Sequence, residues 1–159
     1  MTRTSDSNFT SGITFVEMIL VIAIFAIVTV IAVGAFSKAT GREALDKKTG
    51  VALSLLEQAR NLTLSAKGAS VYGVHFEATK AVLFSGSTYS ASAASNVTES
   101  VSSPVQISSI NLFGGGSDVL FNRLVGDTGQ SGTVTLSLIA SSTQAKTITI
   151  FATGLSQSN

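Results

Sequence analysis

A run of twenty consecutive uncharged residues, from Met18 to Ser37, limits most strongly what this chain can fold into; it reads MILVIAIFAIVTVIAVGAFS. At about 1.5 Å per residue, a helix of this length spans roughly 30 Å, the thickness of the hydrocarbon core of a bilayer. An ordinary secretory signal has a shorter apolar region with a small-x-small cleavage site after it, and no such site follows cleanly here. The run therefore predicts a membrane-spanning helix that stays attached to the chain.

The composition argues against most kinds of catalysis. Only 12% of the 159 residues are charged and the net charge is +1, which gives no bulk field to hold nucleic acid or an anionic membrane. The chain has no cysteine, which excludes a disulfide framework, a thiolate nucleophile and a zinc finger. It has one histidine, and no set of nucleophile, base and acid is visible. We expect no enzymatic activity, no catalytic residue, no metal site and no cofactor.

One acidic residue, Glu17, stands directly before the apolar run. An ionisable side chain near the centre of a membrane costs about 2.5–3.5 kcal/mol, so an acid at membrane depth indicates a functional role. An acid in the first turn of a helix is also favoured by the helix dipole, by about 0.3–1 kcal/mol. The residue alone does not decide between these two explanations.

The segment SGITFVE of residues 11–17, followed by the apolar run, resembles the leader junction of type IV pilins and type II secretion pseudopilins. The resemblance implies that residues 1–12 are a leader, which a prepilin peptidase removes by cutting between Gly12 and Ile13. It also implies that Ile13 becomes N-methylated and that Glu17 is the acid at the fifth position of the mature chain. Ile13 stands where this family commonly has phenylalanine.

Filament assembly gives a physical reason for an acid at this position. After the cut, Ile13 carries a cationic amine at the edge of the bilayer. Where helices of several subunits pack together, Glu17 of one subunit can pair with the amine of its neighbour. A buried ion is tolerated mainly when it is paired, and removal of one partner costs about 3–5 kcal/mol. Glu17 also lies four residues from Ile13 of its own chain, so a contact within one chain is the alternative.

The basic residues around the run bear on topology. Arg3 precedes the run, whereas Lys38, Arg42, Lys47 and Lys48 follow it, so the positive-inside rule would place the C-terminal part in the cytoplasm. We set this rule aside because of the resemblance, and because the remainder of the chain is rich in serine and threonine and poor in lysine. We expect a single-pass inner-membrane protein with an extracytoplasmic C-terminal domain, which later joins a pilus or pseudopilus.

The helical pattern continues beyond the membrane segment of residues 13–37. Between residues 38 and 68 small and large apolar residues recur at spacings of three and four, which predicts an amphipathic helix with one face for a core; they are Leu45, Ala52, Leu55, Leu56, Ala59, Leu62 and Ala66. Gly34, Gly41 and Gly50 are points where a long helix could bend or melt. Gly68 is the expected end of the helix.

After Gly68 the apolar residues alternate with period two, which predicts strands. Residues 71–77 and 80–85 form a predicted hairpin with Tyr72, Val74 and Phe76 on one face, and the further predicted strands are 105–112, 119–125, 133–139 and 146–152. Residues 86–103, rich in serine and alanine, are predicted to be a long surface loop or a poorly ordered insert. Residues 69–159 are thus predicted to form an antiparallel β-sheet domain packed on the helix, an α+β and pilin-like fold.

Four short segments of the C-terminal part resemble the H-type pseudopilins and the related fimbrial T-type minor pilins. They are residues 54–60, 72–76, 132–136 and 146–150, and the last of them is followed by Gly154. Some members of this group bind DNA through basic residues beside the C-terminal strand. Here the tail, residues 154–159, reads GLSQSN without arginine or lysine. This departure argues against nucleic acid as a partner, because neutralising phosphates requires cations.

Other polar residues give weak signals. His75 is isolated in the sequence, and we predict a surface histidine on the outer face of its strand. Asp118 and Asp127 are single acids that turn formation explains better than calcium binding. The run Gly114–Gly116 lacks the Gly-Lys-Ser/Thr ending of a phosphate-binding loop and is predicted to be a flexible turn.

The sequence therefore predicts a structural subunit, a minor pilin or pseudopilin of a type IV pilus or type II secretion filament. The resemblance implies as partners prepilin peptidase, other pilin or pseudopilin subunits, an inner-membrane assembly platform and the lipid bilayer. The alternative is a binding module on the same scaffold, a pilus-tip adhesin or DNA-uptake receptor. A basic or aromatic surface cluster would favour the alternative, and the tail shows none.

Overall fold

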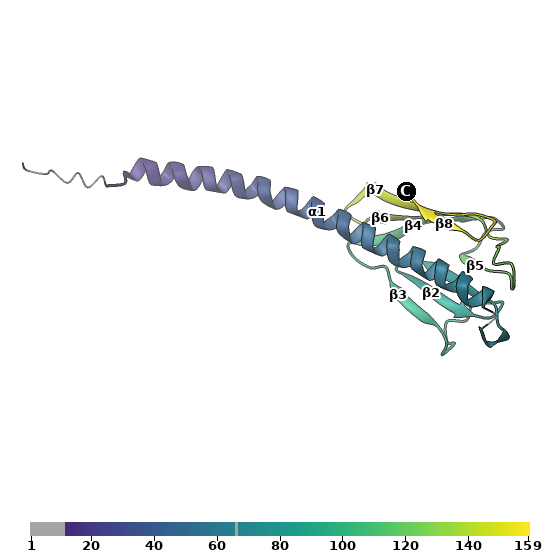
Figure 1. The fold of residues 1–159 in the computed structure, drawn as a ribbon. Helices are drawn as coiled ribbons and strands as arrows, with labels where there is room; N and C mark the ends of the chain where they lie inside the picture. The colour runs from purple at the N-terminus through teal and green to yellow at the C-terminus, as the bar shows by residue number, and fades with distance from the viewer. Residues whose placement is uncertain (1–11, 66) are drawn as a thin grey trace, which may run out of the picture. The chain divides into compact units, whose positions relative to one another are not determined.

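The structure is a computed structural model that describes residues 12–65 and 67–159 (Figure 1). Residues 1–11 of the predicted leader lie outside the described residues. The chain divides into two compact units, Met1–Lys38 and Ala39–Asn159. One helix, α1, spans Phe15–Leu64 and contributes its first part to one unit and its second part to the other.

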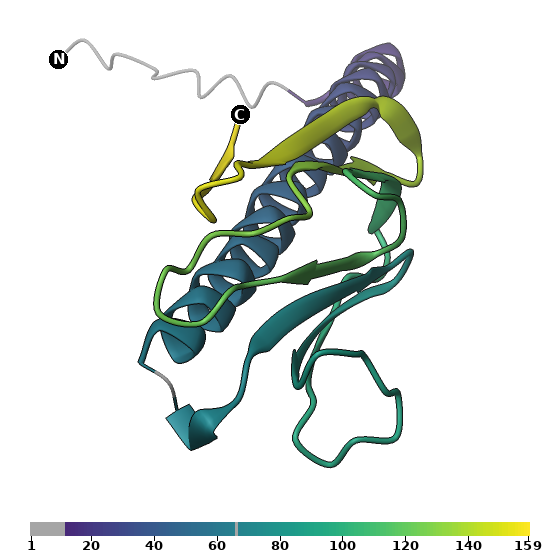
Figure 2. The ribbon, with the colours of Figure 1, turned by 90° about the vertical axis from the view of Figure 1, so that its right-hand side faces the viewer.

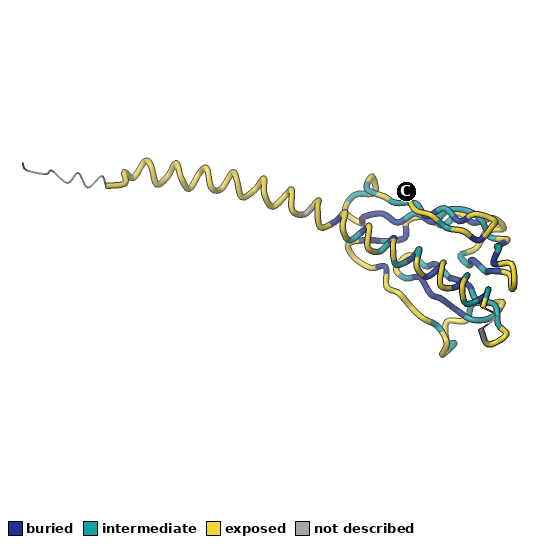
Figure 3. Tube along the Cα trace, in the orientation of Figure 1, coloured by how far each residue is buried: buried dark blue, intermediate teal, exposed yellow. Residues whose placement is uncertain are grey.

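In the first unit, α1 carries the apolar run identified in the sequence. Its backbone remains helical through Gly34, and the described side chains of residues 12–38 are exposed along the whole segment (Figure 3). A helix that is apolar all round has no polar face to turn toward water. The first unit therefore has no core of its own among the described residues.

In the second unit, α1 is amphipathic as predicted. Leu45, Ala52, Leu55, Leu56 and Ala59 are buried on one face, and Leu62 packs against them half-buried. The helical backbone continues through Gly41 and Gly50 and ends at Leu64. A short 3-10 turn, Lys67–Ala69, follows, in which Gly68 has φ 64°, a left-handed conformation that favours glycine. The helix thus ends a few residues before the predicted stop.

Two four-stranded antiparallel sheets follow the helix. Sheet A has the order β3-β2-β1-β5, with β1 Tyr72–Glu77, β2 Lys80–Ser85, β3 Val97–Ser100 and β5 Asp118–Leu120. Sheet B has the order β4-β6-β7-β8, with β4 Val105–Leu112, β6 Gly132–Leu138, β7 Ser141–Ile150 and β8 Ser156–Ser158. Figure 2 shows both sheets beside the C-terminal part of α1.

One hydrophobic core joins the helix to the inner faces of both sheets. Sheet A contributes Val74, Phe76, Ala81, Leu83 and Val119, and sheet B contributes Val105, Ile107, Leu112, Val134, Leu136, Leu138, Ile148 and Ile150. Gly41 lets the helix approach sheet B, because a Cβ there would lie 3.0 Å from Leu138 Cδ1. The alternation seen in the sequence therefore corresponds to alternate residues that face this core.

The structure corrects the expectation of a single sheet. The α+β class, the first hairpin and the inward face of Tyr72, Val74 and Phe76 are confirmed, but the strands form two sheets. The connection between them passes through Val101, whose backbone N–H bonds to Thr79 O, and the core then continues into β4. Residues of both sheets share one core with the apolar stripe of α1 from Leu45 to Ala59.

The structure differs from the sequence-based prediction at four places in the C-terminal part. The stretch 86–103 contains strand β3, which pairs with β2, so it is not one uninterrupted loop. The predicted strand 119–125 ends at Leu120, because Asn122 and Asp127 close a turn by side-chain and backbone hydrogen bonds. Strand β7 begins earlier than predicted, at Ser141, and the polar strand β8 was not predicted.

Candidate functional site

The start of α1 holds the residues predicted to act in processing and assembly. Gly12, Ile13 and Thr14 precede the first helical residue, Phe15, and all are exposed. Thr14 is the N-cap: its Oγ1 accepts a hydrogen bond of 3.2 Å from the backbone N–H of Glu17, the third residue of the helix. Threonine followed three residues later by glutamate is the pattern of a capping box. The sequence analysis did not identify Thr14, although the spacing Thr-x-x-Glu was visible.

Glu17 lies in the first turn, where its negative charge faces the positive end of the helix dipole. Its side chain is exposed and forms no ion pair within residues 12–65 and 67–159. The carboxylate therefore has a favourable local position and remains available to a cation from another chain. The proposed pairing with an amine at Ile13 stays a prediction.

The helix that follows presents a continuous apolar surface. Sixteen large apolar side chains from Ile13 to Phe36 are at least 52% exposed, and the most apolar window has a mean hydropathy of 3.0 with none of it buried. By length and composition this is a helix that could cross a membrane. The Thr29 hydroxyl donates a 2.7 Å hydrogen bond to Phe25 O, so this polar atom is satisfied within the helix. Such a bond suits an apolar environment, where water is not available.

A polar cluster on the outer face of sheet A was not predicted. His75 Nδ1 lies 2.5 Å from Asp118 Oδ1, across the pairing of β1 with β5, and His75 Nε2 lies 3.5 Å from Glu77 Oε1. Lys80 Nζ lies 3.1 Å from Glu77. This hydrogen bond, followed by the charge of Glu77, raises the pKa of Lys80 above its ordinary value. His75 is thus on the outer face as expected, but the prediction that it stands alone was wrong.

Tyr89 closes this cluster from the loop after β2. Its ring stacks on the imidazole of His75, with centroids 3.9 Å apart and an interplanar angle of 9°. It also meets Phe84 edge-on, with centroids 5.6 Å apart. Phe84 and Val82 are each only 1% exposed and do not belong to the main core. The loop around Tyr89 therefore covers a small apolar layer on the outside of sheet A.

Replacing Tyr89 by alanine is expected to loosen this loop without unfolding the domain. The substitution removes two ring contacts, each worth about 0.5–1.5 kcal/mol beyond area burial, and uncovers Phe84. We expect a loss of about 1–3 kcal/mol in the free energy of unfolding and faster amide hydrogen exchange in residues 80–96. Ser95→Ala, an exposed position in the same loop, is the matched control. Unchanged exchange in Tyr89→Ala would mean that the loop is held by other contacts.

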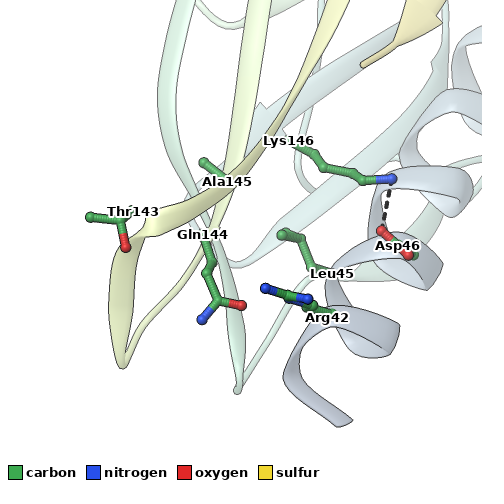
Figure 4. A pocket seen from close by; sticks show the side chains of 7 residues that line it. All are labelled: Arg42, Leu45, Asp46, Thr143, Gln144, Ala145 and Lys146. Atoms are coloured by element: carbon green, nitrogen blue, oxygen red, sulfur yellow. Dashed lines mark ion pairs between the residues drawn. The ribbon is translucent and has the colours of Figure 1, made fainter. Parts of the chain in front are cut away.

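A hollow of about 320 Å³ lies between the second part of α1 and strand β7 (Figure 4). An ion pair of 2.7 Å between Asp46 Oδ1 and Lys146 Nζ crosses it, and both side chains are at least 35% exposed. Such exposed pairs contribute about 0–1 kcal/mol. Gln144 Oε1 is buried without a hydrogen-bond partner in the described part of the chain. The hollow contains neither a nucleophile–base pair nor a metal-ligand set.

The remaining predicted polar residues have structural roles. Asp127 Oδ1 accepts a 2.8 Å hydrogen bond from Asn122 Nδ2 and closes a turn, as expected. Gly114, Gly115 and Gly116 all have positive φ and form a turn between β4 and β5. Asp118 stands at the start of β5 and not in a turn, since it pairs with His75. Within residues 12–65 and 67–159 no three His, Asp or Glu side chains are arranged to hold a metal ion.

No protein-family model, curated protein or solved structure matches this chain. The class of protein is therefore defined by the chain's own features. It is an α+β protein that combines an exposed apolar helix, long enough to cross a membrane, with a second unit of two antiparallel sheets packed on the C-terminal part of that helix.

Proposed function

We propose that this protein is a structural subunit, a minor pilin or pseudopilin, that assembles into a type IV pilus or type II secretion filament through its N-terminal helix. The observation that carries the proposal is the exposed apolar surface from Ile13 to Phe36, which holds one acid, Glu17, in its first turn. Lipid covers such a surface before assembly, and neighbouring apolar helices cover it in a filament. The resemblance of residues 11–17 to a prepilin junction supports the same conclusion.

The proposed maturation changes the charge at the start of the helix. Cleavage between Gly12 and Ile13 by a prepilin peptidase creates an amine one residue before the N-cap Thr14. N-methylation of Ile13 leaves this amine cationic. The amine of one subunit then pairs with Glu17 of the next, because both charges are costly in an apolar medium unless they meet. The pair fixes the register between subunits and has no catalytic role.

The proposal places the second unit outside the cytoplasm, against the positive-inside rule. Its surface supports this placement, since the outward residues Thr133, Thr135, Thr147 and Thr149 of β6 and β7 are polar and uncharged. The helix is anchored in the inner membrane before the subunit passes to the assembly platform and then to the filament.

A fusion of alkaline phosphatase to Asn159 tests this topology, because the enzyme becomes active only outside the cytoplasm. We expect high phosphatase activity from the fusion in cells. A matched fusion that ends at Thr10, before the apolar run, is expected to stay inactive. An inactive fusion at Asn159 that accumulates at full length would contradict the proposed topology.

A further inference from the structure

The outer face of sheet B carries exposed aromatic and polar side chains that belong neither to the core nor to the proposed assembly helix. Leu112, Gly132 and Ile150 lie side by side on β4, β6 and β7, and the apolar pair in this row points into the core. The residues on either side of this row, along each strand, therefore face outward. On one side they are Asn111, Thr133 and Thr149, and on the other Phe113 and Phe151.

Two phenylalanines thus flank one stretch of the outer face. Phe113 is 76% exposed and Phe151 is 41% exposed, although each adjoins a buried core residue. Phe113 directly follows β4 and Phe151 directly follows β7, and β6 separates these two strands, so the two backbones lie about 10 Å apart at the ordinary strand spacing. Both side chains line the same open hollow of about 520 Å³.

The polar groups of this hollow are uncharged and free. Its lining contains no Lys, Arg, Asp or Glu. Within the part of the chain that the structure describes, the side chains of Asn111, Thr133 and Thr149 make no hydrogen bond to the protein. The next outward pair differs, since Thr135 Oγ1 and Thr147 Oγ1 bond to each other at 3.2 Å. The free amide and hydroxyls next to the phenylalanines can both donate and accept.

We propose that this face of sheet B binds a neutral glycan, an extended chain of hexose units that lies across Phe113 and Phe151. The C–H faces of sugar rings pack on exposed aromatic rings, and rings two units apart along an extended hexose chain match the separation of the two strands. Asn111, Thr133 and Thr149 exchange hydrogen bonds with the sugar hydroxyls. A charged partner does not fit, because nothing in the hollow pairs with its charge. The inference rests on the second unit alone and is independent of processing and assembly.

The test uses the full chain, purified in a detergent without a sugar headgroup, and microcrystalline cellulose and chitin beads as probes. We expect retention on at least one of them that persists at high salt and is released by the matching soluble hexasaccharide. Phe113→Ala and Phe151→Ala are each expected to weaken binding about tenfold, the effect of losing one well-packed contact. Both side chains are exposed, so the folded state should survive, which a thermal unfolding curve checks.

Ile139→Ala is the matched control, because Ile139 is 57% exposed just beyond the opposite end of β6. It is expected to bind like the unchanged chain. Failure of the chain to bind either polysaccharide would overturn the proposal. Equal retention of the double variant Phe113→Ala/Phe151→Ala would show adsorption through the apolar helix and would also overturn it. A change in oligomer size in that variant, without a change in retention, would assign the face to contacts between copies.

Discussion

Replacing Glu17 by alanine is expected to leave the chain in the membrane and to remove it from the filament. The neighbouring subunit's amine would then be buried without its partner, at a cost of about 3–5 kcal/mol. A cost of this size lowers incorporation by at least about a hundredfold, since each 1.4 kcal/mol is a factor of ten. Thr14 Oγ1 binds the backbone N–H of residue 17, so this capping bond survives the substitution. Quantitative immunoblots of sheared filaments and of membranes measure the two populations.

Glu43→Ala is the matched control, because Glu43 is another exposed acid on α1, located beyond the apolar run. It is expected to enter filaments at the unchanged level. Glu17→Gln separates charge from shape, and we expect it to fail as alanine does. If Glu17→Ala enters filaments normally, the acid has no pairing role, and its position reflects only the helix dipole.

Replacing Gly154 by alanine is expected to destabilise the second unit strongly. Gly154 has φ 76°, and a Cβ there would lie on Gly126 O, too close for any side chain. The same carbonyl accepts a 2.9 Å hydrogen bond from Arg60 Nε, which ties the turn at residues 122–127 to α1. The backbone must therefore move and break this bond. We expect a loss of at least about 3 kcal/mol, a large part of the stability of an ordinary domain.

Protease resistance of the second unit and its thermal unfolding in detergent measure this effect. Gly129→Ala is the control, because nothing lies within 4 Å of its Cβ position and its φ is not positive. It should melt within a few degrees of the unchanged chain. A Gly154→Ala chain that is as stable as Gly129→Ala would mean that the turn at residues 151–155 adopts another conformation.

Sequence patterns predicted those elements whose apolar residues repeat regularly. The buried stripe of α1 from Leu45 to Ala59 follows the helical period, and Val134, Leu136 and Leu138 follow the strand period. Strands β3 and β8 were not identified as strands, because their side chains lie at sheet edges and none belongs to the buried core, so no alternation marks them. The sequence could not predict the number of sheets either, because that number depends on which strands pair and not on where strands occur.

The site residues could likewise be predicted only where they are neighbours in the sequence. Glu17 and its junction were visible because all their residues are adjacent in the sequence. The contact between His75 and Asp118 joins residues 43 positions apart, and only the pairing of β1 with β5 brings them together. Phe113 and Phe151 likewise line the same hollow only because β6 pairs with both of their neighbouring strands. The tail holds no aromatic surface cluster of the kind that would favour a binding role, whereas the fold brings one together from two separate strand ends.

Intact mass measurement and N-terminal peptide mapping of the chain, isolated from membranes of cells that contain the peptidase, test the central claim most directly. The account predicts a mature chain that begins at Ile13 and carries one additional methyl group on its amine. A chain that still begins at Met1, or one cut beyond Ser37 so that the apolar helix is lost, would contradict it.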